Sequence, residues 1–327
     1  MSILRANNID TLPESLRNGV VAIGNFDGVH LGHQSVLQNA ISAHVEGPRL
    51  VLTFEPHPRQ FFQPDTVLRR ITPAAQRAKV IGAAGFDAVI ELGFTGDFSK
   101  LTAEEFVTRI LLEGLGAKHV VTGFDFHFGT KRQGGPAFLM EAGSRHGFEV
   151  TLVDAFRDET ADVVSSSRIR DALYGGNLTL ANDLLGYRYQ VSAPISKGKQ
   201  LGRTLNYPTA NMALPNETPL AHGVYAVRFI REDGSIHDGV ASFGRRPTVD
   251  EDGAPLLETH VFDFADDLYG ENCTACLVAR LRGEEKFNGL DALKEQMDKD
   301  AAKAREILAD LRPLSDLDAK LTFGSAA

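Results

Sequence analysis

The chain has little cysteine, no long hydrophobic run and no excess of positive charge, and each absence excludes a class of protein. Only two of its 327 residues are cysteines, which excludes a disulfide framework and favours a cytoplasmic location. No apolar run reaches the roughly 18 residues of a membrane helix, and the segment from Met1 to Pro13 lacks the apolar core of a targeting peptide. A net charge of −9 disfavours nucleic acid and anionic membranes as partners.

Several familiar binding patterns are missing as well. Cys273 and Cys276 form a single CxxC, which supplies only half of the ligands of a structural zinc site, so we interpret them as small residues beside a strand. The chain has neither the GxGxxG pattern of dinucleotide-binding folds nor the Walker A pattern. A nucleotide would therefore have to bind through a different motif.

What is present fits two domains of ordinary globular composition, 43% hydrophobic and 24% charged. From Gly19 to Val153, short apolar runs alternate with amphipathic stretches, which is typical of helices that cover a parallel sheet. The first domain is therefore predicted to be α/β, with a Rossmann-like, doubly wound parallel sheet. Its predicted strands are Val20–Gly24, Leu50–Phe54, Ala88–Leu92, His119–Thr122 and Glu149–Val153, and its predicted helices are His33–Ala43, Pro73–Ala84, Ala103–Leu115 and Pro136–His146.

The pattern changes after Ser165. One short helix, Ser167–Tyr174, precedes a series of strands with no helices between them, which indicates a small antiparallel β-barrel or a sandwich. A charge-laced amphipathic helix, Leu290–Leu311, ends the domain. We place the boundary near Leu185, giving domains of residues 1–185 and 186–327. The predicted strands are Tyr189–Ile195, Gly223–Ile230, Ile236–Phe243, Leu257–Phe262 and Ala275–Leu281.

The segment from Gly24 to His33 leaves the first strand and enters the first helix. Its glycines let the backbone approach a ligand, and the amides at the helix start favour phosphate. His30 and His33 are three residues apart, so both imidazoles can donate to one phosphate group, as adenylyl transfer requires. The alternative is a pair of surface histidines on a glycine-rich turn. We predict that His30 and His33 are catalytic and that Gly24, Asn25, Phe26, Asp27 and Gly28 bind ATP phosphates.

These residues, GNFDGVHLGH, resemble the HxGH signature of the nucleotidyltransferase superfamily, and in this longer form they are similar to the bacterial bifunctional riboflavin kinase/FAD synthetases. The resemblance implies that Ser166, Ser167 and Arg168 bind phosphate and that Arg170 is catalytic, although a capping box with surface arginines is the alternative. Two further segments fit the family, and each follows a predicted strand, where ligands bind in open sheets. They supply a predicted flavin site of Phe54, His57, Asp125, Phe126 and Phe128, although each Phe could instead be core and His57 could cap a turn.

A second candidate site lies between Lys197 and Glu258. Thr209 and Asn211 alternate, so on an extended backbone one oxygen from each could complete the shell of a Mg²⁺ that ATP phosphates already hold. A polar turn explains the stretch equally well. The stretch is similar to the GxxxGxPTAN signature of riboflavin kinases, which implies that metal role and adds Gly198, Lys199 and Gly202 as phosphate ligands.

The same resemblance implies that Glu258 is the general base of the kinase, whereas the alternative is a solvated glutamate on a strand. Ser242 departs from the family, because many relatives have Asn there. The function implied is phosphorylation of riboflavin by Mg²⁺ and ATP in the second domain and adenylylation of FMN to FAD in the first. Transient self-association is left open. The rival functions are a single-activity adenylyltransferase with a regulatory barrel and a non-catalytic flavin carrier.

Overall fold

The structure is a computed structural model that describes residues 3–197, 207–245 and 254–324. It divides into two compact units, one of residues 1–68 and 72–166 and the other of residues 69–71 and 167–327. Residues 167–185 therefore group with the second unit, and the predicted boundary at Leu185 stays a prediction. No helix in the described ranges is both long and apolar enough to cross a membrane.

The first unit is built on a six-stranded parallel sheet with the order β1-β4-β3-β2-β5-β6. The chain moves outward from β2 in one direction through β3 and β4, and then crosses to β5 and β6 on the other side. The topological switch point therefore lies between β2 and β5, as expected for a doubly wound sheet. The strands are β1 (Leu4–Ala6), β2 (Val20–Ile23), β3 (Arg49–Glu55), β4 (Ala88–Gly93), β5 (His119–Gly123) and β6 (Glu149–Val153).

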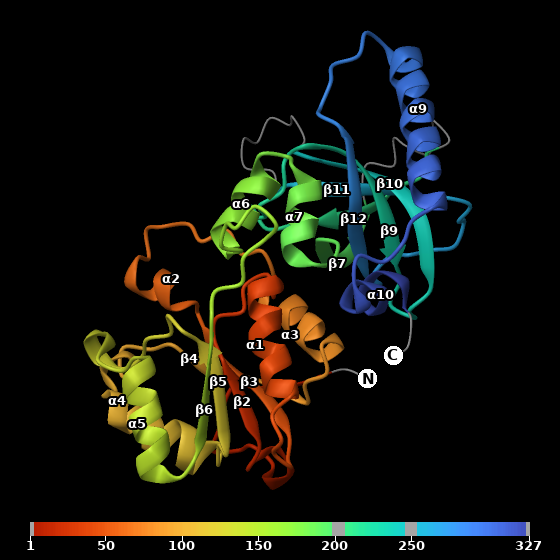
Figure 1. The fold of residues 1–327 in the computed structure, drawn as a ribbon. Helices are drawn as coiled ribbons and strands as arrows, with labels where there is room; N and C mark the ends of the chain where they lie inside the picture. Colours follow the sequence, from red (N-terminus) through yellow and green to blue (C-terminus); the bar gives the residue numbers. More distant parts are fainter. Residues whose placement is uncertain (1–2, 198–206, 246–253, 325–327) are drawn as a thin grey trace. The chain divides into compact units, whose positions relative to one another are not determined.

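Helices cover both faces of this sheet. Figure 1 shows α1 and α3 on one face and α4 and α5 on the other. The predicted helix over residues 103–115 begins with a Thr102–Glu105 capping box and continues as a π-helix, a difference that hydrophobic spacing does not reveal. The helices are α1 (Leu31–Ile41), α2 (Pro58–Phe62), α3 (Ala74–Ala83), α4 (Ala103–Glu105), α5 (Pro136–His146), the π-helix η3 (Phe106–Gly114) and the short 3₁₀ turns η1 (Glu14–Leu16), η2 (Phe98–Lys100) and η4 (Thr130–Arg132).

The second unit is a closed antiparallel barrel with the strand order β10-β11-β8-β7-β12-β9, which decides between the predicted barrel and sandwich. Strands pair around the whole circuit, so the barrel has no open edge. Its elements are α6 (Ser166–Tyr174), α7 (Leu178–Leu185), β7 (Gln190–Ser196), β8 (Ala210–Ala213), β9 (Gly223–Ile230), β10 (Ile236–Gly244), β11 (Leu256–Val261), β12 (Asn272–Arg282), α9 (Leu290–Ala309) and α10 (Asp316–Phe323).

Cys273 and Cys276 lie on β12, both fully buried, and neither is part of a disulfide. Gln190 Nε2 donates to Cys276 Sγ at 3.2 Å. Burial raises the pKa of the Cys273 thiol to about 11. Both thiols therefore sit in the packed part of the barrel wall, in keeping with their interpretation as small residues on a strand.

A buried ion pair anchors α10 to the barrel. Asp318 is fully buried and accepts hydrogen bonds from the Arg188 backbone amide at 3.0 Å, from Arg188 Nη1, and from Thr322 Oγ1 at 2.7 Å. Burial lowers the pKa of Arg188, an effect that the Asp318 carboxylate opposes. Because both charges lie out of water, each depends on the other.

We expect Asp318→Asn to lower the free energy of unfolding of the second unit by about 3–5 kcal/mol, because the buried Arg188 guanidinium then has no counter-charge. Asp316→Asn is the matched control, since Asp316 is exposed in the same turn, and should change stability by less than about 0.5 kcal/mol. Urea unfolding followed by circular dichroism measures both. Equal midpoints for the two variants would contradict the prediction.

Candidate active sites

The loop from Gly24 to His33 leaves the C-terminal end of β2 and leads into α1. Because β2 and β5 flank the switch point, this loop lies where open parallel sheets bind ligands. Its backbone is unusual, with φ of +51° at Phe26, +87° at Gly28 and +40° at Val29. A positive φ suits glycine, but it is an outlier for a β-branched valine. The loop is therefore held in a strained shape by its surroundings.

Thr72, just before α3, provides one of these restraints. Its backbone amide donates to Asp27 Oδ1 at 3.0 Å, and its hydroxyl accepts from the Gly28 amide at 2.8 Å. Ser166 Oγ donates to the Asp27 carbonyl at 2.9 Å. Asp27 is 4% exposed, so its carboxylate is a buried acceptor that ties the loop to Thr72. No role in this site was predicted for Thr72, and a direct contact of Asp27 with phosphate stays a prediction.

The structure brings the two predicted catalytic histidines together. Their rings are stacked with centroids 3.7 Å apart and planes at 21°. His30 is the N-cap of α1, and its Nδ1 accepts from the His33 amide at 3.4 Å. A Cβ at Gly32 would lie 3.1 Å from the His30 ring, which explains a glycine between them. With Nδ1 as acceptor, the proton of neutral His30 is on Nε2, where it can serve a phosphate oxygen.

His33 is held neutral by its surroundings. Burial, then the nearby His30 and then Arg77, lower the pKa of His33 well below its usual value. Its Nδ1 is buried and has no hydrogen-bond partner among the described residues. Since buried polar atoms are normally satisfied, this nitrogen is a natural contact for a bound ligand.

The serine and arginine motif divides between the two units. Ser166 belongs to the first and contacts Asp27 as described above. Ser167, Arg168 and Arg170 belong to the second, where Arg170 Nε donates to the Arg69 carbonyl at 2.7 Å. The phosphate contacts predicted for these residues stay predictions.

The predicted flavin residues have different surroundings. Phe54 and Phe128 are 6% and 7% exposed and belong to the hydrophobic core of the first unit. Phe126 is half-buried and stacks on Phe128 with ring centroids 5.5 Å apart, and Asp125 is exposed. His57 caps α2, where its Nδ1 accepts from the Arg59 amide at 3.1 Å. Phe54, Phe128 and His57 thus have the structural roles that were their alternatives, and flavin binding by the set stays a prediction.

In the second unit, three candidate residues lie side by side across adjacent strands. Glu258 of β11 pairs in register with Asn211 of β8 on one side and with Ser242 of β10 on the other. Paired residues of antiparallel strands project from the same face. Leu257 and Thr259, which alternate with Glu258, are fully buried, so the three residues project from the outer surface of the barrel. Ser242 thereby lies next to the predicted general base.

The surroundings of Asn211 fit a metal-bound phosphate. Asn211 is 5% exposed, and its Oδ1 is buried with no partner among the described residues. Its Nδ2 donates to the Thr209 carbonyl at 3.2 Å, so the two predicted metal ligands are in contact. A buried, unsatisfied amide oxygen beside a carboxylate is a hard-oxygen donor set of the type that Mg²⁺ accepts. Gly198, Lys199 and Gly202 lie outside the described residues.

Residues that the sequence analysis did not predict hold this segment in place. Tyr207 Oη donates to Asp298 Oδ1 of α9, and the Tyr207 ring packs 4.7 Å from that of His260. His260 Nδ1 lies 3.0 Å from the Pro208 carbonyl. Burial, then the hydrogen bond to Asp298, raise the pKa of Tyr207 to about 12, so its phenol stays protonated as a donor. Residues 207 and 208, directly before Thr209, are therefore fixed from both β11 and α9.

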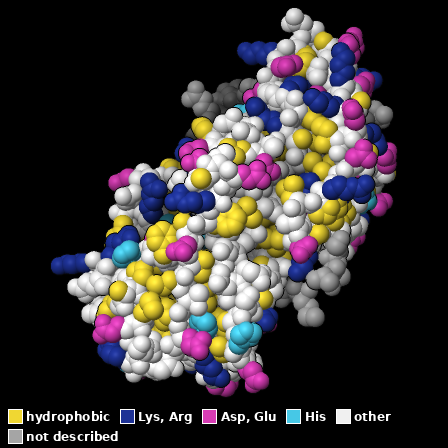
Figure 2. Space-filling view, viewed as in Figure 1, with side chains coloured by type: hydrophobic (Ala, Val, Ile, Leu, Met, Phe, Trp, Pro, Cys, Tyr) yellow, Lys and Arg dark blue, Asp and Glu magenta, His cyan; other side chains and the backbone are white. Residues whose placement is uncertain are grey.

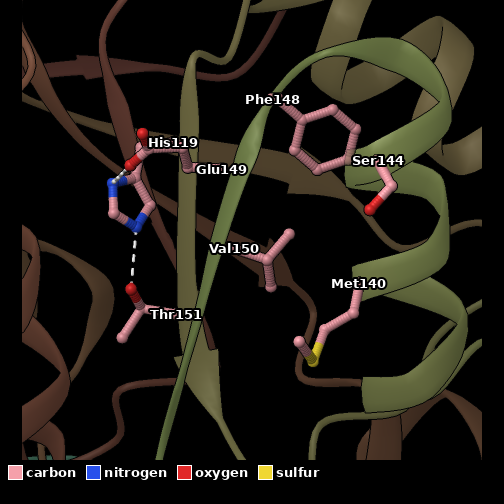
Figure 3. Close-up of a pocket in the computed structure, with 7 residues that line it drawn as sticks. All are labelled: His119, Met140, Ser144, Phe148, Glu149, Val150 and Thr151. Atoms are coloured by element: carbon pink, nitrogen blue, oxygen red, sulfur yellow. Dashed lines mark hydrogen bonds and ion pairs between the residues drawn. The ribbon is translucent and has the colours of Figure 1, made fainter.

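A cavity of about 320 Å³ lies elsewhere, along the edge strand β6. In Figure 3, His119, Glu149 and Thr151 lie on one side of this strand, and Phe148 and Val150 lie on the other. The cavity thus follows the edge of the sheet, and none of the predicted site residues lines it. Burial lowers the pKa of His119, although Glu149 opposes this.

On the face drawn in Figure 2, basic and acidic side chains are interspersed.

Comparisons with known proteins identify both domains. A family model for FAD synthetase matches residues 12–168, and one for riboflavin kinase matches residues 185–308. The chain is 42% identical, over 90% of its length, to the bifunctional riboflavin kinase/FMN adenylyltransferase of Pseudomonas fluorescens, of which it covers 94%. It is 36% identical, over 96% of its length, to the protein of that name from Escherichia coli K12, of which it covers 100%.

The fold is also found in a crystal structure of a macrolide-efflux protein from Streptococcus pneumoniae. The TM-score is 0.80 at 30% identity, with 95% of this chain and 100% of that chain covered. The order of the two family matches and the coverage of the relatives confirm the resemblance seen in the sequence. The chain therefore belongs to the family of bifunctional riboflavin kinase/FMN adenylyltransferases, with the FAD synthetase domain first and the riboflavin kinase domain second.

Proposed function

We propose that the Gly24–His33 loop carries out FMN adenylylation with ATP as the adenylyl donor. The stacked His30–His33 pair at the N-terminus of α1, at the switch point of the sheet, carries this assignment. The FMN phosphate attacks the α-phosphorus of ATP, and pyrophosphate leaves with the bonding electrons. Charge builds on the non-bridging oxygens, where the helix amides and the imidazole N–H groups would stabilise it. The loop contributes position and neutralisation without a covalent intermediate.

We propose that riboflavin is phosphorylated on the outer surface of the barrel, beside Glu258. The register pairing of Glu258 with Asn211 carries this assignment. Glu258 would accept the proton of the riboflavin 5′-hydroxyl as the oxygen attacks the γ-phosphorus of ATP. Thr209 and Asn211 would hold the Mg²⁺, which supplies neutralisation of the phosphate charge. The half-buried position of Glu258 leaves its carboxylate within reach of a substrate.

The experiment that tests both assignments is a time course with purified protein, riboflavin, ATP and Mg²⁺. We expect FMN to appear first, FAD to follow, and two molecules of ATP to be used for each FAD. Excess EDTA should suppress FMN formation, because the phosphates of free ATP lose their counter-charge. The absence of both flavins by chromatography would contradict the proposal. A cytoplasmic location and transient self-association stay predictions.

A further inference from the structure

A buried arginine, Arg77 of α3, joins the core of the first unit to the adenylyl-transfer loop. Its side chain is the largest of the fully buried set, at 1% exposure. A guanidinium out of water is costly unless its charge and donors are matched. Its Nη2 donates to Glu55 Oε1 at 2.6 Å and to Glu91 Oε1 at 2.9 Å. Arg5 donates to the other oxygen of Glu91 at 2.8 Å, so two guanidinium groups meet two carboxylates.

The other terminal nitrogen of Arg77 acts on the loop itself. Nη1 donates to the Asn25 carbonyl at 3.2 Å, and Thr53 Oγ1 donates to the same carbonyl at 3.3 Å. Asn25 directly precedes Phe26, the first residue of the loop with a positive φ, and Val29 is the second non-glycine residue of this kind. Each such residue costs about 1–3 kcal/mol and persists only where the surroundings hold it. The carbonyl that Arg77 holds is the last peptide group before this strained stretch.

We propose that Arg77 is a positioning residue for FMN adenylylation, because its hydrogen bond to the Asn25 carbonyl holds the Gly24–His33 loop in the conformation that directs its amides and histidines at the nucleotide. The inference rests on the proposed role of that loop. Charge supports it independently. After burial, the pKa of His33 is lowered by the neighbouring His30 and then by the Arg77 guanidinium, so loss of the Arg77 charge should raise that pKa.

The test compares Arg77→Met and Arg77→Lys with a matched control, Arg5→Met. Arg5 shares Glu91 with Arg77 but has no contact with Asn25 among the described residues, so Arg5→Met reports the ion network alone. We expect Arg77→Met to lower kcat for FAD formation from supplied FMN by about 10- to 100-fold, with a smaller change in KM. Arg5→Met should stay within about twofold of wild type. FMN formation from riboflavin by the same protein should be unchanged, since that chemistry belongs to the second unit.

Arg77→Lys separates charge from geometry. Lysine keeps the charge but lacks the planar guanidinium, whose separate N–H groups donate to the Asn25 carbonyl and to both carboxylates. We therefore expect kcat to fall in both Arg77 variants, while the pKa of His33, followed by NMR and assigned with His33→Gln, rises only in Arg77→Met. If Arg77→Met loses its near-ultraviolet circular dichroism and is therefore not folded, the kcat of Arg77→Lys is compared with that of Arg5→Met instead. A folded variant of either kind with wild-type kcat would overturn the inference. If FAD formation is intact both in the Arg77 variants and in His30→Ala, the proposed function of the loop is wrong. If FAD formation is intact in the Arg77 variants but lost in His30→Ala, the proposed function stands and only this inference is wrong.

Discussion

Glu258→Gln is expected to lower FMN formation from riboflavin by about 10²- to 10⁴-fold, the usual contribution of a general base. Glutamine keeps the size of the side chain and its place beside Asn211, but it cannot accept the proton of the attacking hydroxyl. FAD formation from supplied FMN should continue at the wild-type rate, because it belongs to the other unit. Chromatography of reactions started from riboflavin and from FMN measures the two rates separately.

The control for this variant is Glu306→Gln, an exposed glutamate of α9, which should leave both rates unchanged. Glu258→Asp is informative as well, since a shorter carboxylate keeps the base but retracts it from the substrate. We expect partial activity from that variant. FMN formation at the wild-type rate in Glu258→Gln would assign the glutamate to the solvated strand position that was its alternative.

Much of the fold follows from local pattern. The strand Gly223–Ile230 and the helix Pro136–His146 have the predicted bounds, because a buried strand is a continuous apolar run and an amphipathic helix has a clear period. Several of the missed elements are short or polar, but the two eight-residue helices α7 and α10 were also missed, and α7 has five buried residues. The three-residue β1 gives no period, and β8 begins inside the polar segment that carries Asn211, so its place in the barrel depends on pairing with β11 and β7.

The sites were predictable only as far as they are contiguous in the chain. His30 and His33 are three residues apart within one motif of the sequence, and the N-terminus of α1 brings them together. Arg77 is different, because on an amphipathic helix an arginine is normally assigned to the exposed face. Its burial depends on Glu55, Glu91 and the Asn25 carbonyl, which come from three other parts of the chain. Spacing also cannot distinguish a core Phe54 from the wall of a flavin pocket.

His30→Ala is expected to make FMN accumulate in reactions started from riboflavin. Loss of one donor to a developing phosphate charge lowers kcat by about 10²- to 10³-fold, so FAD formation slows while the kinase step continues. The substitution also removes the N-cap of α1, whose loss costs about 1 kcal/mol. His30→Asn separates the two effects, since asparagine caps a helix well but is too short to replace the imidazole Nε2.

The ratio of FMN to FAD over time, in wild type, His30→Ala, His30→Asn and the exposed control His44→Ala, distinguishes these contributions. If the phosphate contact dominates, both His30 variants accumulate FMN and His44→Ala does not. If capping dominates, His30→Asn recovers most of the FAD formation. Loss of both activities in His30→Ala would contradict separable sites. Because the proposed kinase site uses no residue of the Gly24–His33 loop, we expect FMN formation in these variants to stay at the wild-type rate.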